Sequence, residues 1–209
     1  MRYVAIDGPT GVGKSTTSRL LANRLGLPLL LDPVSASPLL DDYYVGYDTT
    51  ESALAAEMAF LDLRASLVTI GDVGERDVRD DTAFGVDAVS DFTVLRTGPF
   101  AHFLDDVSHR RRVLDELERR LASCVGPSAF VLLDAPAEVL LERVRLRNRD
   151  AEHALDLGHL RALTGFFAEW RDRLLAQTDR HLVIDTTTWD PHRPAHLDTI
   201  VDWLERTAP

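Results

Sequence analysis

The segment Gly8–Ser15, GPTGVGKS, places a lysine and a hydroxyl side chain directly after a glycine-rich turn. It fits the pattern G-x-x-x-x-G-K-[ST], in which backbone N–H groups surround a phosphate and the positive end of the following helix adds to the attraction. Lys14 is the only lysine in the chain, and an ammonium on a flexible stem suits the outer phosphates. The motif predicts binding of ATP and Mg²⁺, with the Ser15 hydroxyl on the metal. The residues assigned to the nucleotide are Gly8, Thr10, Gly11, Val12, Gly13, Lys14, Ser15 and Thr16.

Four arginines alternate with other residues in RVRLRNR, residues 143–149, although the chain has a net charge of −11. Arg143 and Arg147 are four positions apart and share a helix face, as do Arg145 and Arg149. Arginines neutralise the charge on a phosphoryl group in transfer reactions. Taken together with the glycine-rich motif, the arginine cluster predicts a lid at about residues 143–155 that closes over the triphosphate. The alternative is a solvated arginine-rich helix end.

Two aspartates end apolar, strand-like runs: Asp32 closes the run 27–32 and Asp91 closes the run 86–91. In parallel sheets ligands bind beyond the carboxyl ends of the strands, which brings both aspartates to the same edge as Gly8. With the common strand order, Asp32 would lie directly beside the strand of the glycine-rich motif. A carboxylate there can accept a proton from an acceptor hydroxyl. The alternative is that Asp32 only forms the turn before the following proline.

Short apolar runs alternate with segments of helical periodicity along the chain. This alternation predicts an α/β protein with the P-loop NTPase fold, a five-stranded parallel sheet with helices on both faces, in one domain over 1–209. The predicted strands are 2–8, 27–32, 86–91, 128–136 and 181–185. The predicted helices are 14–26, 37–45, 51–70, 100–123, 137–149, 156–178 and 194–206, and 72–81 is a predicted loop.

The composition excludes several classes of function. A pI near 5.0 argues against binding of nucleic acid or of an anionic membrane, because both polyanions repel an acidic surface. Cys124 is the single cysteine, so no intrachain disulfide can form and a reducing cytoplasm is expected. The first ten residues have no signal-peptide pattern, and no apolar run is long enough to cross a bilayer. The seven histidines show no zinc-binding spacing.

Three segments resemble the deoxynucleoside kinase family, over about residues 3 to 185. DPVSASPLLDDYY…EMAFLDLR is similar to that family's E-P-V-x-x-N-P-x-L-x-x-F-Y…Q-x-x-F-L-x-x-R. The spacing R-x3-R-x-R-x2-E over residues 143–152 resembles its lid, R-x3-R-x-R-x-E-E. The SDFT segment stands where the family has an acid followed by arginine and serine. The resemblance implies phosphorylation of the 5′-hydroxyl of a (deoxy)nucleoside by ATP with Mg²⁺. Related kinases pair helices into dimers, so it also implies a homodimer, which the sequence itself does not show.

The resemblance also implies a role for each matching position. Asp32 matches the general base that takes the proton from the nucleoside 5′-hydroxyl, and Asp91 matches an acid that helps to hold Mg²⁺. Tyr44 and Glu152 match groups that hydrogen-bond the sugar 3′-hydroxyl. The catalytic arginines of the lid are matched by Arg143, Arg147 and Arg149.

Two departures from the family pattern concern the acceptor. Phe92 replaces the arginine expected after the acid, and its substitute could be Arg79, Arg96 or Arg64. Glu57 replaces a glutamine that reads the base, with Arg64 seven residues later as in the family. An ionised glutamate only accepts hydrogen bonds, so it would favour a base edge rich in N–H donors, such as that of guanine. The alternative is that Glu57 pairs with Arg64, two helical turns away.

Other functions remain open at this point. The opening IDGPTGVGKST also resembles cytidylate kinase, and thymidylate kinase shares the fold, so a nucleoside monophosphate kinase is the second reading. Such an acceptor needs further arginines for its phosphate, and the phenylalanine at position 92 counts against it. The third reading is a kinase for another small hydroxylated metabolite. The fourth is a nucleotide-binding regulator without transfer activity.

Overall fold

The computed structural model describes residues 3–37, 39, 49–69 and 87–207. It confirms the predicted α/β fold, because its five strands form one all-parallel sheet in the order β2-β3-β1-β4-β5. The predicted helix over 37–45 lies almost wholly outside the described residues, and the loop over 72–81, Tyr44 and Arg79 lie entirely outside them. No helix in the described ranges is long and apolar enough to cross a membrane.

The bounds of the elements are as follows. The strands are β1 Tyr3–Asp7, β2 Leu29–Leu30, β3 Ala88–Ser90, β4 Ala129–Asp134 and β5 His181–Asp185. The α-helices are α1 Lys14–Leu25, α3 Thr50–Val68, α4 Thr97–Ala101, α5 Val107–Leu121, α6 Ala137–Arg147, α7 Leu157–Glu169, α8 Arg171–Leu175 and α9 Pro194–Arg206. Three short 3₁₀ helices are η1 Pro33–Ala36, η2 Val94–Arg96 and η3 Asp150–Glu152.

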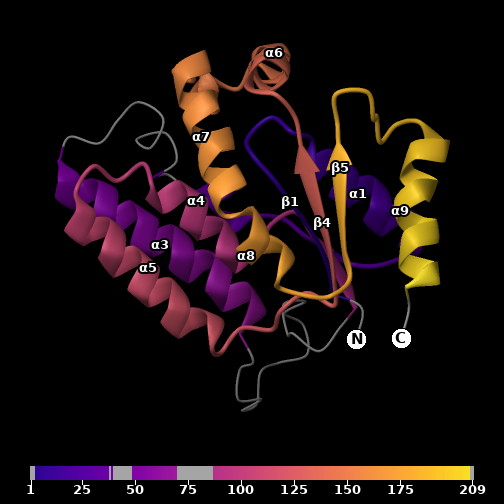
Figure 1. Ribbon diagram of the computed structural model, residues 1–209, viewed down its shortest axis with the longest axis horizontal. Helices are drawn as coiled ribbons and strands as arrows, with labels where there is room; N and C mark the ends of the chain where they lie inside the picture. Colours follow the sequence, from indigo (N-terminus) through magenta and orange to yellow (C-terminus); the bar gives the residue numbers. More distant parts are fainter. Residues whose placement is uncertain (1–2, 38, 40–48, 70–86, 208–209) are drawn as a thin grey trace.

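Two of the predicted long helices are each divided in two. The segment 100–123 forms α4 and α5, because the carboxylate of Asp106 accepts hydrogen bonds from the amides of Ser108 and His109 and so begins a new helix. The segment 156–178 forms α7 and α8, which meet at Trp170 with φ −90° and ψ 0°. Both divisions lie on the side of the sheet that also carries α3 (Figure 1).

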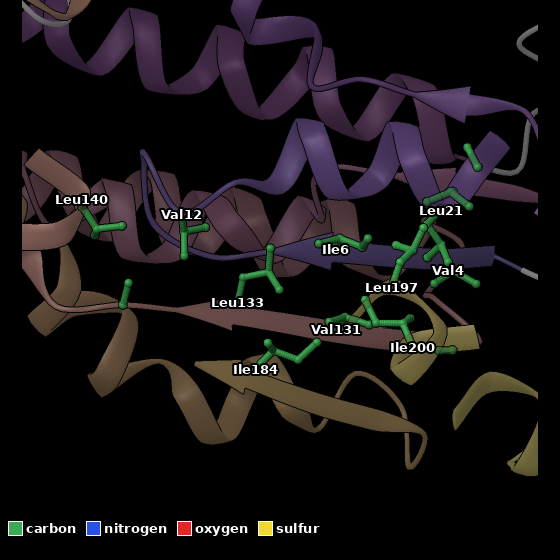
Figure 2. Close-up of a cluster of buried hydrophobic side chains, with 14 of the residues drawn as sticks. Val4, Ile6, Val12, Leu21, Val131, Leu133, Leu140, Ile184, Leu197 and Ile200 are labelled. Carbon is green, nitrogen blue, oxygen red and sulfur yellow. The ribbon is translucent and has the colours of Figure 1, made fainter. Parts of the chain in front are cut away.

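The sheet is buried on both faces because side chains alternate along its central strands. In β1, Val4 and Ile6 pack into one core, while Tyr3 and Ala5 pack into the other. The first core is closed by α1, α6 and α9, and the second by α3, α5, α7 and α8. Figure 2 shows the first core, where side chains of β1, β4 and β5 meet those of α1 and α9.

The strand order corrects one expectation. The strand beside β1 is β3, not β2, and β2 pairs with the far edge of β3. Asp32 therefore follows a strand that lies one position further from the glycine-rich turn, and Asp91 follows the adjacent strand. This order places Asp91 between Asp32 and the turn.

Candidate functional site

The glycine-rich turn packs so closely against its neighbours that side chains are excluded at two positions. Gly8 has φ 144°, and a Cβ there would lie 2.2 Å from the carbonyl oxygen of Leu133 in β4. Gly11 has φ 86°, and its Cβ would lie 2.9 Å from the carbonyl oxygen of Leu140 in α6. Both conformations favour glycine. The turn is therefore fixed between β4 and α6, with its backbone around the start of α1.

Lys14 lies in an environment that favours an anionic ligand. Its Nζ donates to the carbonyl oxygen of Pro9 at 2.9 Å. Burial, together with the charges of Arg96 and Arg147, lowers the pKa of Lys14 to about 7 against the opposing effects of Asp7 and Asp91. A bound phosphate would favour the charged ammonium through direct attraction. The backbone N–H groups at the start of α1 add to this attraction for a phosphate.

Asp91 connects the turn to Asp32. The Ser15 hydroxyl donates to Asp91 Oδ2 at 2.5 Å, and the backbone N–H of Asp32 donates to Asp91 Oδ1 at 2.5 Å. The hydroxyl and the carboxylate are oxygen ligands of the kind Mg²⁺ prefers. Among the described residues no cluster of three or more His, Cys, Asp or Glu could hold a metal by itself. Ser15 and Asp91 thus fit a Mg²⁺ that takes its remaining ligands from phosphate and water.

The Asp32 carboxylate is held by two arginines. Arg64 binds it with two donors, Nε at 3.2 Å from Oδ1 and Nη2 at 3.1 Å from Oδ2, while Arg64 Nη1 donates to Thr97. Arg96 Nε lies 3.7 Å from Asp32 Oδ2. Burial raises the pKa of Asp32, but the charges of Arg64 and Arg96 and hydrogen bonds from Arg64 and Val34 outweigh it and keep the pKa below its usual value. Asp32 is therefore ionised at neutral pH and able to accept a proton.

Arg96 and Asp7 complete this network. Arg96 was one of the three candidates to substitute for the arginine missing at position 92, whereas Asp7 was not predicted as a site residue. Arg96 Nη1 donates to Asp7 Oδ1 at 2.5 Å and to the carbonyl oxygen of Gly8 at 2.9 Å. Phe92 is fully buried in the second core. Of the three arginines that could compensate for it, Arg64 and Arg96 both reach the Asp32 carboxylate. The position of Asp7, immediately before the glycine-rich motif, was the one signal in the sequence.

A single cleft joins these groups. Its walls carry the turn, the network around Asp32 and Asp91, an apolar patch and the end of the predicted lid. The lining residues are Thr10, Gly11, Lys14, Ser15, Asp32, Val34, Glu57, Phe60, Arg64, Asp91, Arg96, Phe100, Arg147, Arg149 and Glu152. Of the assigned nucleotide residues, Val12 packs in the first core and Thr16 is exposed on α1.

Glu57 lies on the cleft wall with its side chain buried, and no described residue provides a hydrogen-bond partner for its Oε2. The expected alternative, an ion pair with Arg64, is not formed, because the Arg64 donors bind Asp32 and Thr97. Burial raises the pKa of Glu57 to about 7, although the charge of Arg64 opposes the rise. Glu57 and Asp32 are thus two cleft carboxyls with opposite pKa shifts.

The arginines of the predicted lid divide into two groups. Arg147 binds the buried carboxylate of Glu152 through Nε, at 3.0 Å from Oε2, and through Nη2, and Arg149 Nη1 lies 3.9 Å from Oε1. All three line the cleft. Arg143 instead donates to the hydroxyl and carbonyl oxygens of Thr186, at 2.7 and 2.5 Å, after β5. The structure therefore brings two of the three predicted arginines to the cleft.

The chain is similar in sequence and in fold to several known proteins. A family model described as deoxynucleoside kinase matches residues 4–201. Deoxyguanosine kinase of Bacillus subtilis (strain 168) is 25% identical over 195 residues, 90% of this chain and 86% of that protein. Cytidylate kinase of Nocardia farcinica (strain IFM 10152) is 30% identical over 217 residues, 98% of this chain and 87% of that protein. A solved structure of deoxyadenosine kinase from M. mycoides with bound dCTP has the same fold, with a TM-score of 0.77 over 98% of this chain and 99% of that chain at 18% identity.

Proposed function

This chain belongs to the deoxynucleoside kinase family, phosphotransferases with an alcohol acceptor, and we propose that it transfers the γ-phosphoryl group of ATP to the 5′-hydroxyl of a nucleoside. The observation that carries this proposal is the hydrogen-bond chain from Ser15 through Asp91 to Asp32. It ends at the backbone N–H of Asp32, whose ionised carboxylate lines the same cleft as the glycine-rich turn, Glu57 and an apolar wall. A nucleoside has a primary hydroxyl at one end and a flat heterocycle at the other, which suits such a cleft.

The proposed step requires little covalent chemistry from the protein. Asp32 accepts the proton of the 5′-hydroxyl as the oxygen forms a bond to the γ-phosphorus, and the bond from that phosphorus to the bridging oxygen of ADP breaks. Lys14, Arg147 and Arg149 are assigned to the phosphate oxygens, where charge is redistributed during transfer. Mg²⁺ held by Ser15 and Asp91 would neutralise part of the triphosphate charge. Glu152, fixed by Arg147, is assigned to the sugar hydroxyl.

A nucleoside monophosphate kinase is the second candidate, favoured by the similarity to cytidylate kinase. Its acceptor carries a phosphate that must be bound by free cations. On the acceptor side, Arg64 binds Asp32 and Thr97, and Arg96 binds Asp7 and Gly8. Because these guanidinium groups already bind carboxylates, a second phosphate would compete with Asp32 and Asp7 for them. This observation favours an uncharged acceptor.

The direct test incubates the protein and Mg-ATP with separate nucleosides and nucleoside monophosphates, and measures added phosphate by mass spectrometry. A Lys14→Ala preparation controls for contaminating kinases. Conversion of at least one nucleoside to its 5′-monophosphate is expected. Phosphorylation of monophosphates alone would establish the second candidate. If ATP binds and no member of the panel reacts, the proposal is wrong, and another hydroxylated metabolite or a nucleotide-binding regulator takes its place.

A further inference from the structure

Glu57 lies at a defined distance from the reacting end of the cleft. Glu57 and Arg64 are seven residues apart on α3, so they share a helix face and are about 10 Å apart along its axis. Arg64 contacts Asp32, which is joined through Asp91 to the phosphate end. Asp32 and Glu57 line the same cleft. An acceptor whose hydroxyl meets Asp32 can therefore extend along α3 and reach Glu57.

The surroundings of Glu57 leave its carboxyl available to a ligand. The cleft that Glu57 lines is also lined by the apolar side chains of Val34, Phe60 and Phe100. Within the described part of the chain, Glu57 Oε2 is buried with no hydrogen-bond partner, an arrangement that is costly unless a ligand or water satisfies it. Other charged groups line the same cleft. They are Arg64 on α3, which also carries Glu57; Asp32 and Asp91 after β2 and β3; Arg96 in η2; Lys14 on α1; and Arg147, Arg149 and Glu152 on the predicted lid.

The chemistry of a carboxyl group depends on its proton. A carboxylic acid offers one O–H donor beside one acceptor, whereas a carboxylate only accepts. Adenine and cytosine each present a ring-nitrogen acceptor beside an amino donor, which complements the acid. Guanine presents two adjacent N–H donors on its Watson–Crick edge, which complement the carboxylate. With burial raising the pKa of Glu57 to about 7, both forms are populated near neutral pH.

We propose that Glu57 selects the base of the acceptor by its protonation state, accepting adenine-type or cytosine-type edges as the acid and guanine as the carboxylate. This inference rests on the proposed function and names its substrate class, nucleosides whose bases carry an exocyclic amino group. It extends the expectation that an ionised Glu57 favours a base edge rich in N–H donors, such as that of guanine. Glutamine at this position would present a fixed donor and acceptor, independent of pH.

The test compares kcat/KM for deoxyguanosine with kcat/KM for deoxyadenosine and deoxycytidine, at pH values on both sides of 7. The ratio of these constants cancels every ionisation that affects all the substrates equally, including those of the phosphate end. In the wild type, the ratio of deoxyguanosine to deoxyadenosine should rise about tenfold as the pH increases through the pKa of Glu57. In Glu57→Gln, which keeps the size of the side chain, the ratio should not change with pH.

Glu152→Gln is the matched control, because it removes another buried carboxyl of the cleft, one that is paired with Arg147. Whatever its overall activity, this variant should keep the pH dependence of the ratio. A flat ratio in the wild type, or an equal pH dependence in Glu57→Gln, would overturn the inference while leaving the nucleoside kinase proposal intact. If no nucleoside is phosphorylated at any pH, the proposed function fails, and the inference fails with it.

Discussion

Glu57 and Asp32 show how one cleft can hold two carboxyls in different ionisation states. Asp32 is bound by a bidentate arginine and lies near a second one, which outweighs the cost of its burial. Glu57 is buried without such a partner, so burial dominates. The difference depends on where the Arg64 guanidinium points. The sequence spacing alone allows Arg64 to pair with either carboxyl, and only the structure decides between them.

The raised pKa of Glu57 has a consequence for stability. Its pKa rises from 4.5 to about 7 on folding, so the folded protein binds more protons than the unfolded chain in this range, and stability falls as the pH rises through it. Glu57→Gln removes this titration. The free energy of unfolding of the variant minus that of the wild type should therefore increase, from acid pH to a pH above 7, by up to roughly 3 kcal/mol. Chemical unfolding of wild type and Glu57→Gln across this range measures the effect. A constant difference between the two would show that Glu57 does not titrate abnormally.

Helix α6 has a structural arginine at the start of the predicted lid. Arg143 donates two hydrogen bonds to Thr186 and so ties α6 to the segment after β5. Helical spacing predicts that Arg143 and Arg147 share one side of α6. It cannot show that the helix axis directs one of them to the end of β5 and the other to the cleft, because that direction depends on how α6 packs on the sheet.

Arg143→Ala should lower the free energy of unfolding by about 1–3 kcal/mol, because it removes two charge-assisted hydrogen bonds in a partly buried site. Arg145→Ala is the matched control. Arg145 is exposed on the same helix, so its removal should change stability by less than about 0.5 kcal/mol. Denaturant titration of the two variants decides the point. Equal losses would mean that the contact with Thr186 contributes nothing.

The elements that hold the site were predicted to different extents. The strands, and the helices that begin at Lys14 and Ala137, followed from apolar runs and from the glycine-rich motif, which are local signals. The division of the segment 100–123 was missed, because helical periodicity continues across a break that the Asp106 cap enforces. The position of Asp91 between Asp32 and the turn was also missed, because strand order is set by packing of the whole sheet.

On the scale of the whole molecule, an acidic protein gathers basic side chains in one cleft. The net charge is −11, yet among the described residues the cleft is lined, beside four acidic side chains, by five basic ones: Lys14, Arg64, Arg96, Arg147 and Arg149. The composition predicted an acidic surface but could not locate this exception, since Arg64 and Arg96 are far from the motif in sequence. Buried cations near one another are stabilised when an anion binds between them.

Mg-ATP should therefore raise the melting temperature. At a concentration 100 times Kd, ligand linkage contributes about 2.7 kcal/mol, which corresponds to a shift of about 5–10 °C for a domain of this size. Differential scanning fluorimetry measures the shift. Lys14→Ala should lose most of the shift. Retention of the full shift in that variant would show that Lys14 does not bind the phosphates.

The central claim, that Asp32 is the base for an acceptor hydroxyl, is tested most directly by Asp32→Asn. The amide keeps the shape of the side chain and can still accept a hydrogen bond from Val34, but it cannot take up a proton. Asp134→Asn, another aspartate at the end of a strand and about half exposed, serves as the control. The measurement is kcat with the best nucleoside of the panel, together with the dissociation constant for ATP. We predict that Asp32→Asn lowers kcat on the order of 10²-fold to 10⁴-fold and leaves the affinity for ATP unchanged. A near-normal kcat, or a loss of ATP binding as large as the loss of kcat, would contradict the account.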